Sequence, residues 1–333
     1  MKQLKIFITG ASSGIGLTTA LHLISRGHFV VGSSRHPERL TKKELKEKVL
    51  RDHTRFRLDK EGRAIPLRIE LPQELQNLDP LLESLMFVAL DPSREGSAEE
   101  AAREFFSLSG GEIDVLFLNA GMGIFGPVEE TEIELVRQQF EANVFQHLKV
   151  LKEFLPVMRE KRKGKVIFTS SLGGLISIPF ESHYSATKAA LERLAEGLRM
   201  ELKPFSIQVA VVEPGDINTA FNLTTAQALK RIAPEAKSDD LSRLLNSFPL
   251  PESSPYYFRA RNSWNYIFRS LLLKPSPSVV ARLMVKLAEK ERIAFRYRAG
   301  DPFQTIPVWM GTKLLPQRVI QWAVEKLYEL DKK

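Results

Sequence analysis

A glycine-rich turn near the N-terminus constrains the fold of this chain more than any other feature. A short apolar run at residues 4–8 leads into the stretch TGASSGIG at residues 9–16, and apolar residues then recur at helical spacing as far as Ile24. A second apolar run follows at residues 29–32. A strand, a glycine turn and a helix in this order let the backbone approach a pyrophosphate at the positive end of the helix. The stretch therefore predicts the first half of a dinucleotide-binding βαβ unit, with an ordinary strand-to-helix turn as the alternative.

The alternation of strands and helices continues along the chain. Further apolar runs occupy residues 87–90, 115–118, 166–169 and 207–212, and long helical patterns occupy residues 133–158 and 184–198. Near-continuous apolar strands separated by helices are typical of a parallel sheet that is buried on both faces. We expect an α/β protein with one Rossmann-type doubly wound parallel sheet, helices on both faces, and a single domain over residues 1–333.

Two segments depart from this regular pattern. Residues 36–86 form an insertion after the second strand, in which Thr41 and Glu44 predict a helix capping box and alternating residues on either side of Gly62 predict a β-hairpin. The pattern lapses again over residues 216–270, which are rich in aromatic side chains and prolines. This second segment predicts an irregular lid over a ligand site, with a lipid- or partner-facing surface loop as the alternative. Helical spacing returns over about 277–330, where we expect C-terminal helices.

Composition narrows the classes of function. The chain has 333 residues, a formal net charge of +8 and no cysteine. Disulfides and thiolate metal sites are therefore excluded, and no other metal site is predicted. Basic residues are scattered among acids without a recognisable nucleic-acid-binding module, so we expect no nucleic-acid partner. No apolar run is long enough to span a bilayer, so we expect a cytoplasmic protein whose positive charge also suits contact with an anionic membrane surface.

Tyr184 and Lys188 carry the clearest chemical signal. They stand four residues apart, so a helix places both on the same face. A neighbouring ammonium favours the phenolate and lowers the pKa of a phenol, which makes the pair a proton-transfer device. A solvated helix face is the alternative, because this spacing also arises by chance. Ser171, at the end of an apolar run, and Asn143, within the preceding helical pattern, accompany the pair.

Taken together, these motifs resemble the short-chain dehydrogenase/reductase family. The resemblance covers most of residues 1–35 and 86–220, and within it the runs at 154–158 and 173–180 are most similar to the branch that contains 17β-hydroxysteroid dehydrogenase type 1 and photoreceptor retinol dehydrogenase. The matching residues, in chain order, are Gly10, Gly14, Gly16, Asp91, Asn119-Ala120-Gly121, Asn143, Ser171, Tyr184, Lys188, Pro214-Gly215 and Thr219.

The resemblance implies a role for each of these residues. It implies that Tyr184 is the general acid/base, that Lys188 lowers the Tyr184 pKa and holds the nicotinamide ribose, and that Ser171 hydrogen-bonds the substrate oxygen. It also implies that Asn143 holds a helix kink and the water of a proton relay. The cofactor contacts implied in the same way are Gly10, Ser12, Ser13, Gly14, Ile15, Gly16, Ser34, Arg35, Asp91, Asn119, Ala120, Gly121, Tyr184, Lys188, Pro214, Gly215, Ile217 and Thr219.

The end of the second strand bears on which cofactor is bound. Enzymes that use the unphosphorylated dinucleotide usually place a carboxylate here to hold the ribose 2′-hydroxyl. Residues 33–35 are Ser-Ser-Arg, and the Arg35 guanidinium suits a 2′-phosphate, with Ser34 able to add a hydroxyl. We therefore predict NADP(H), with Arg35 as a merely solvated surface charge as the alternative.

These observations predict an NADP(H)-dependent oxidoreductase that interconverts an alcohol and a ketone or aldehyde on a steroid-, retinoid- or lipid-like substrate. We expect Leu172, Phe180 and the loop 123–125 to line its apolar pocket. We also expect a homodimer that pairs the helices at 133–160 and 184–202. The alternatives are a 3-oxoacyl thioester reductase, which the long segment after Thr219 disfavours, and a non-catalytic dinucleotide-binding regulator, in which Tyr184 or Lys188 would be lost.

Overall fold

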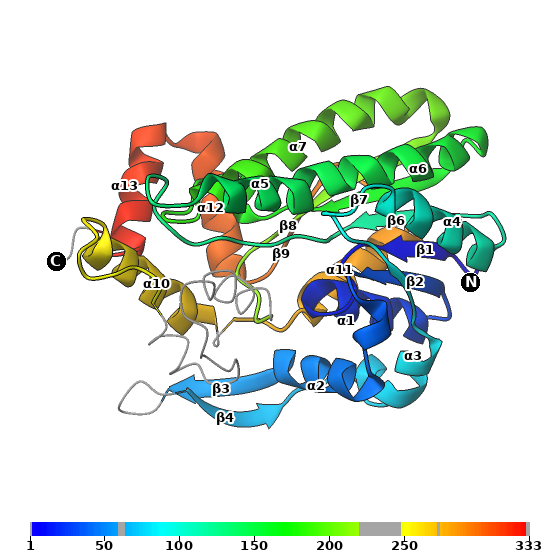
Figure 1. The fold of residues 1–333 in the computed structure, drawn as a ribbon, viewed down its shortest axis with the longest axis horizontal. Coiled ribbons are helices and arrows are strands. Elements are labelled where there is room, and N and C mark those ends of the chain that lie inside the picture. The colour runs from blue at the N-terminus through cyan, green and yellow to red at the C-terminus, as the bar shows by residue number, and fades with distance from the viewer. Residues whose placement is uncertain (1, 59–63, 220–247, 272–273, 331–333) are drawn as a thin grey trace.

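Seven parallel strands form the central sheet of the computed structural model, which describes residues 2–58, 64–219, 248–271 and 274–330 (Figure 1). Their order is β5-β2-β1-β6-β7-β8-β9, and every neighbouring pair is parallel. The strands are β1 (Lys5–Ile8), β2 (Phe29–Ser34), β5 (Met86–Ala89), β6 (Val115–Leu118), β7 (Gly164–Thr169), β8 (Ile207–Pro214) and β9 (Arg296–Ala299). The predicted doubly wound Rossmann-type sheet is confirmed. In such a sheet, ligands bind beyond the carboxyl ends of the strands, near the point where the strand order reverses.

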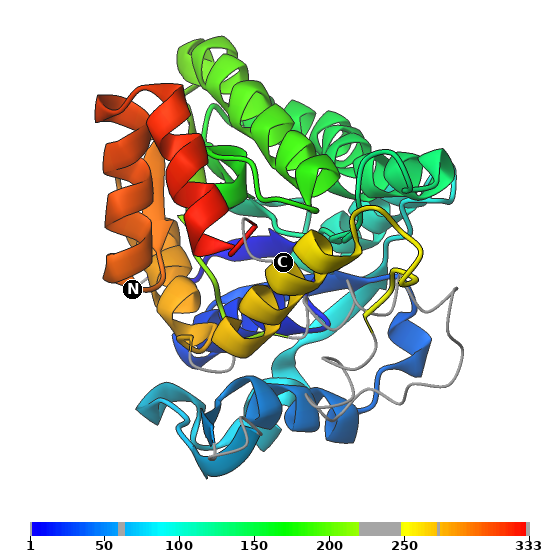
Figure 2. The same ribbon diagram turned by 90° about the vertical axis from the view of Figure 1, so that its left-hand side faces the viewer.

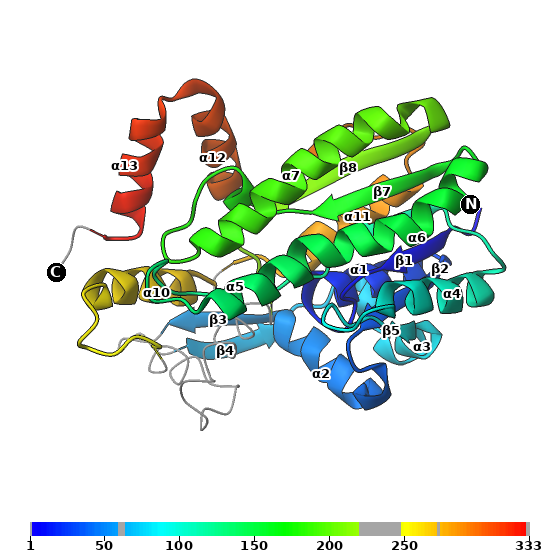
Figure 3. The same ribbon diagram turned by 45° about the horizontal axis from the view of Figure 1, so that its top comes forward.

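Helices cover both faces of the sheet (Figures 1, 2 and 3). One layer contains α1 (Gly14–Ser25) and α11 (Ser278–Glu289), and the other contains α4 (Ser97–Ser109), α6 (Gln146–Glu160) and α7 (Ser182–Leu202). Side chains alternate across a strand, so Ile6 and Ile8 pack into the core under α1 and α11, whereas Phe7 packs into the core under α4 and α6. Two apolar cores, one on each face, therefore hold the sheet flanked by helices.

The insertion after β2 packs beside α1. It consists mainly of α2 (Lys42–Asp52), the antiparallel pair β3 (Thr54–Leu58) and β4 (Ala64–Ile69), and α3 (Leu78–Ser84). The predicted capping box is confirmed, because Thr41 and Glu44 bond each other's backbone N–H at the start of α2. The predicted hairpin is confirmed as well. Leu45 and Leu82 are buried in the same core as α1, which favours the predicted single domain.

The predicted long helix from residue 133 is interrupted by one wider turn. It comprises α5 (Ile133–Phe140), a π-helical turn (Glu141–Phe145) and α6. The apolar residues along the segment recur every three or four positions, so this pattern does not mark the turn. Asn143 lies within the π turn and is fully buried. Such π turns frequently occur at functional sites.

The C-terminal third contains structure that was not predicted. We expected residues 216–270 to be irregular, but part of this segment forms the helix α10 (Tyr257–Leu271), in which Ala260 and Trp264 are buried. Residues 220–247 of the expected lid lie outside the described residues. Strand β9 carries no apolar run, and the guanidinium of its Arg296 pairs with the carboxylates of the buried Glu192 and Glu213. The expected C-terminal helices are α11, α12 (Pro302–Leu314) and α13 (Gln317–Leu327). No helix in the described ranges is long and apolar enough to cross a membrane.

Candidate active site

A cavity of about 1260 Å³ lies at the carboxyl ends of the strands. That volume exceeds the usual range for one small ligand, so the cavity has room for a dinucleotide and part of a substrate. All of the predicted site residues line it except Gly16 and Asn143. The loops after β1, β2, β5, β6, β7 and β8 bring these residues together from distant parts of the chain.

The glycine turn forms one wall of the cavity. Gly10 and Gly14 have φ angles of 67° and 56°, a region that favours glycine. A Cβ on Gly10 would lie 2.8 Å from the Cα of Ala120, and one on Gly16 would lie 2.2 Å from the carbonyl oxygen of Gly10. Gly16 therefore permits close packing beneath the turn and does not itself face the cavity. The turn presents the start of α1 to the cavity, which fits a pyrophosphate.

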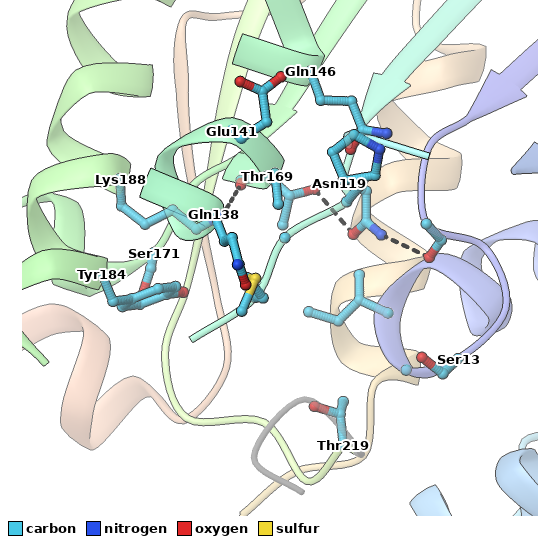
Figure 4. A pocket seen from close by; sticks show the side chains of 18 of the residues that line it. Ser13, Asn119, Gln138, Glu141, Gln146, Thr169, Ser171, Tyr184, Lys188 and Thr219 are labelled. Carbon is cyan, nitrogen blue, oxygen red and sulfur yellow. Dashed lines mark hydrogen bonds between the residues drawn. The ribbon is translucent and has the colours of Figure 1, made fainter. Parts of the chain in front are cut away.

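The side chain of Asn119 links the carboxyl ends of three strands by hydrogen bonds. Its Nδ2 donates to the carbonyl oxygens of Thr9 and Gly10, at 3.2 and 3.3 Å, and its Oδ1 accepts from the Thr169 hydroxyl at 3.2 Å (Figure 4). Because these bonds engage the amide, the side chain holds β1, β6 and β7 in register beneath the cavity. Asn119 also lines the cavity wall.

Ser34 and Arg35 flank the cavity at the end of β2. The Arg35 side chain is exposed, and the Ser34 hydroxyl accepts from the His36 backbone N–H at 3.3 Å. Partial burial raises the pKa of Asp91, but hydrogen bonds from Ser93 and the charges of Arg35 and His36 outweigh it, so the Asp91 pKa lies below its ordinary value. This end of the cavity thus combines an arginine with an ionised carboxylate that follows the neighbouring strand β5.

Ser171, Tyr184 and Lys188 stand together at the other end of the cavity (Figure 4). Tyr184 and Lys188 lie on α7 and are 8% and 3% exposed. The Lys188 ammonium lies 5.7 Å from the centre of the Tyr184 ring and donates to the Thr169 carbonyl at 2.9 Å. Ser171 follows β7, and its hydroxyl accepts from the Gly173 N–H at 3.0 Å. A phenol, a hydroxyl and an ammonium therefore converge in one buried place.

The pKa of Tyr184 shifts in the direction opposite to the sequence expectation. Burial raises the Tyr184 pKa above its ordinary value, and a hydrogen bond with Ser171 lowers it by a smaller amount. Burial also lowers the pKa of Lys188, to about 8. Both shifts have one physical cause, since burial disfavours the charged form of each group. The net shift of the Tyr184 pKa is therefore upward, and Tyr184 at neutral pH is a protonated phenol that can donate to an oxygen. The expected effect of Lys188 on this pKa stays a prediction.

Asn143 does not line the cavity, but it forms hydrogen bonds with the loop and the helix that do. Its Oδ1 accepts from the Met122 N–H at 2.7 Å, and its Nδ2 donates to the Met122 carbonyl and to the Thr187 hydroxyl, both at 2.9 Å. These bonds join the loop after β6 to α7. The side chain therefore positions the helix that carries Tyr184 and Lys188.

Sequence reasoning missed several residues that line the cavity. Glu181 stands three residues before Tyr184 and Asp216 directly follows Pro214-Gly215, so their nearness to known motifs was the available signal. Tyr328 comes from the far end of the chain and gave no signal.

The residues expected to form the apolar pocket do not line the cavity. Leu172, Phe180 and the loop 123–125 are absent from its walls. The ring of Phe125 instead contacts the rings of Phe180 and Trp264, with centres 5.7 and 4.9 Å apart. These residues therefore do not belong to this cavity, and the rings of Phe125 and Phe180 pack together with Trp264 of α10. A separate apolar pocket lined by them stays a prediction.

The parallel sheet, the glycine turn and the Ser-Tyr-Lys group define the class of an NAD(P)-dependent oxidoreductase. Comparison with known proteins agrees. The family model described as short chain dehydrogenase matches residues 5–64 and 66–230. The chain belongs to the short-chain dehydrogenase/reductase family, as predicted.

Similar proteins within the family differ in the substrates that their names give. The chain is 29% identical over 325 residues to the 3-ketodihydrosphingosine reductase of Bacteroides thetaiotaomicron, covering 98% of each chain. It is 35% identical over 221 residues to human 17-beta-hydroxysteroid dehydrogenase type 1, covering 66% of this chain and 59% of the human one. A short-chain dehydrogenase structure from Streptomyces avermitilis matches with a TM-score of 0.65 at 25% identity, covering 100% of this chain and 98% of the other. The branch predicted from the sequence stays a prediction.

Proposed function

We propose that this protein is an NADP(H)-dependent oxidoreductase that interconverts an alcohol and a ketone or aldehyde on an apolar substrate. The buried phenol of Tyr184, grouped with Ser171 and Lys188 at one end of a dinucleotide-sized cavity, carries this proposal. When bound, the reduced nicotinamide supplies a hydride to the carbonyl carbon. Negative charge then develops on the substrate oxygen and needs a donor there.

The residues of the chain supply that donor and hold the reactants. Tyr184 donates its proton to the oxygen, Ser171 donates a hydrogen bond to the same oxygen, and Lys188 holds the nicotinamide ribose. Asn143 positions α7 through its bonds to Thr187 and the Met122 loop. In the reverse reaction, Tyr184 accepts the proton of the alcohol.

The remaining cavity residues fit the rest of the dinucleotide. We assign the turn from Gly10 to Gly16 to the pyrophosphate, Asp91 and Asn119 to the adenine side, and Thr219 to the nicotinamide amide. Ser34 and Arg35 provide a hydroxyl and a guanidinium for a 2′-phosphate, and neither they nor Ser33 is acidic. NADP(H) is accordingly the proposed cofactor.

An apolar ketone is the proposed substrate, in line with the names of the sphingoid-ketone and hydroxysteroid relatives. The test measures NADPH consumption with a long-chain ketone, a steroid ketone, retinal and an acetoacetyl thioester. We expect kcat/KM for at least one of the large apolar carbonyl compounds to exceed that for the thioester at least about tenfold, which corresponds to about 1.4 kcal/mol. A preference for the thioester would identify an acyl thioester reductase, and no consumption with any compound would favour a dinucleotide-binding regulator.

We also propose that the α12–α13 pair rests on an anionic bilayer surface. In Figure 3 the pair projects from the body of the molecule. Its apolar side chains are strongly exposed: Phe303 is 92% exposed, Leu314 71% and Trp322 59%. The basic residues Lys313 and Arg318 stand at the turn between the two helices. Exposed apolar side chains next to bases suit the interface of an anionic membrane. Tyr328, just after α13, lines the cavity, so this surface adjoins the proposed substrate site.

Co-sedimentation with phosphatidylcholine vesicles that contain phosphatidylglycerol tests this surface. We expect the wild type to bind, and Phe303→Ser combined with Trp322→Ser to lose most binding, because exposed aromatic rings supply the apolar contact. Val128→Ser, at a position that is 62% exposed elsewhere, is the matched control and should bind like wild type. Equal sedimentation of all three proteins would reject the proposal.

The proposed assembly is a homodimer through α5–α6 and α7. Ile133 and Met200 on these helices are each 67% exposed, which leaves apolar surface for a second copy. Light scattering at micromolar concentration should give the mass of a dimer. A monomer mass would reject this assembly.

A further inference from the structure

Two carboxylates share the cavity with Tyr184. Glu181 immediately precedes α7, and Asp216 follows β8. Glu181 is the residue just before the first turn of α7, three residues ahead of Tyr184, and both residues line the cavity. Burial is the main cause of the raised Tyr184 pKa, and the charges of Glu181 and Asp216 raise it further. Both acids therefore act electrostatically on the phenol at the reaction centre.

The described part of the protein provides hydrogen bonds and positive charge to Asp216 but not to the Glu181 carboxylate. Asp216 accepts from Gln304 Nε2 at 2.7 Å and feels the charge of Lys274, whose ammonium is also 4.0 Å from Asp301. The Glu181 carboxylate has no hydrogen-bond or ion-pair partner within the described ranges of the chain. Burial raises the Glu181 pKa to about 8, and the negative charge of Asp216 raises it further. At neutral pH the Glu181 carboxyl is therefore mostly protonated, and a positive group placed between the two acids would favour its ionised form and relieve the repulsion from Asp216.

Aromatic rings lie beside these acids. Tyr328 lines the cavity, and its ring centre is 4.8 Å from that of Tyr266 on α10. Burial raises the pKa of Tyr328, and the charges of Asp216 and Glu181 raise it further. Burial and the charge of Asp216 also raise the pKa of Tyr266. The faces of such rings attract cations. Carboxylates and aromatic rings thus lie together in this part of the cavity. This combination suits a substituted ammonium group of a ligand better than an uncharged group.

We infer that the substrate is a long-chain amino ketone, or the corresponding amino alcohol, whose ammonium group binds Glu181 with support from Asp216 and Tyr328. This inference rests on the proposed function, because Tyr184 fixes where the carbonyl oxygen lies. Because Glu181 and Tyr184 line the same cavity and stand three residues apart, we place the ammonium one or two carbons from that carbonyl, toward Glu181. The amine either takes up the proton of Glu181 or arrives protonated and displaces that proton to solvent, so charge balances in both cases.

A matched pair of ketones tests the inference. NADPH consumption is measured with a long-chain 2-amino-3-ketone and with the same chain lacking the amine. A charge-assisted contact is expected to favour the amine by about 10- to 100-fold in kcat/KM. Consumption of NADPH with the neutral ketone, without preference for the amine, would overturn this inference and leave the proposed function standing. No consumption with any carbonyl compound would overturn both.

Variants of Glu181 separate recognition from a structural role. Glu181→Gln should lower the ratio of amine to neutral kcat/KM at least tenfold, because it removes the charge and keeps the shape. Glu181→Asp should restore part of the ratio, whereas Glu201→Gln, an exposed position at the far end of α7, should keep the wild-type ratio. A wild-type ratio in Glu181→Gln would overturn the assignment of the ammonium to Glu181.

Discussion

The Tyr184→Phe variant is expected to lose most of its turnover, about 10²- to 10⁴-fold in kcat on a confirmed ketone. The phenol is buried beside Ser171, and its raised pKa keeps it protonated, so it is the group placed to donate to the substrate oxygen. Phenylalanine keeps the ring that fills this buried position and removes only the hydroxyl group. The fold and NADPH affinity should therefore stay close to wild type.

Three measurements decide this prediction: kcat on the confirmed substrate, NADPH binding by fluorescence, and thermal unfolding. Tyr297→Phe, on the edge strand β9, is the matched control, because it removes a phenolic hydroxyl away from the cavity. Retention of half of the wild-type kcat by Tyr184→Phe would show that another group donates the proton.

Exchange of Ser34 for Asp together with Arg35 for Ala should reverse the cofactor preference. Arg35 offers paired donors to a 2′-phosphate, whereas a carboxylate at residue 34 would repel the phosphate and bond the 2′-hydroxyl of NADH. One charge-assisted hydrogen bond is worth about 1.5–3 kcal/mol. The wild type should then favour NADPH by about 10- to 100-fold in kcat/KM, and the double variant should favour NADH.

The comparison needs a control for general loss of positive charge. Arg39→Ala serves, because its side chain is 75% exposed and lies outside the cavity walls. It should keep the wild-type preference. Equal kcat/KM for NADH and NADPH in the unmodified protein would contradict the assignment of Arg35 without any variant.

Local patterns in the sequence were sufficient for the sheet and most of the cavity. Strands such as β6 are continuous apolar runs, and the glycines at 10, 14 and 16 mark a turn that other residues could not form. Strand β9 was missed because it carries no apolar run, and its Arg296 pairs with Glu192 and Glu213, which are far away in the chain. The same limit applies to α10, whose Trp264 is buried by contact with Phe125.

The chemistry of the site was harder to predict from the sequence than the identity of its residues. The spacing of Tyr184 and Lys188 correctly placed both on one helix face, but the direction of the Tyr184 pKa depends on burial and on Glu181 and Asp216. Neither acid belongs to the motifs. Tyr328 reaches the cavity only through the packing of the C-terminal helices, which no local pattern reports. Long-range contacts therefore decide the features that distinguish this site.

Transfer of deuterium tests the central claim most directly. The purified protein is given a long-chain ketone and NADPH that carries deuterium at the transferable position, and the alcohol is analysed by mass spectrometry. We expect one deuterium on the carbinol carbon per NADPH consumed, from one face of the nicotinamide, with the rate falling sharply in Tyr184→Phe. Consumption of NADPH that leaves the carbinol carbon unlabelled would contradict the assignment of this cavity to carbonyl reduction.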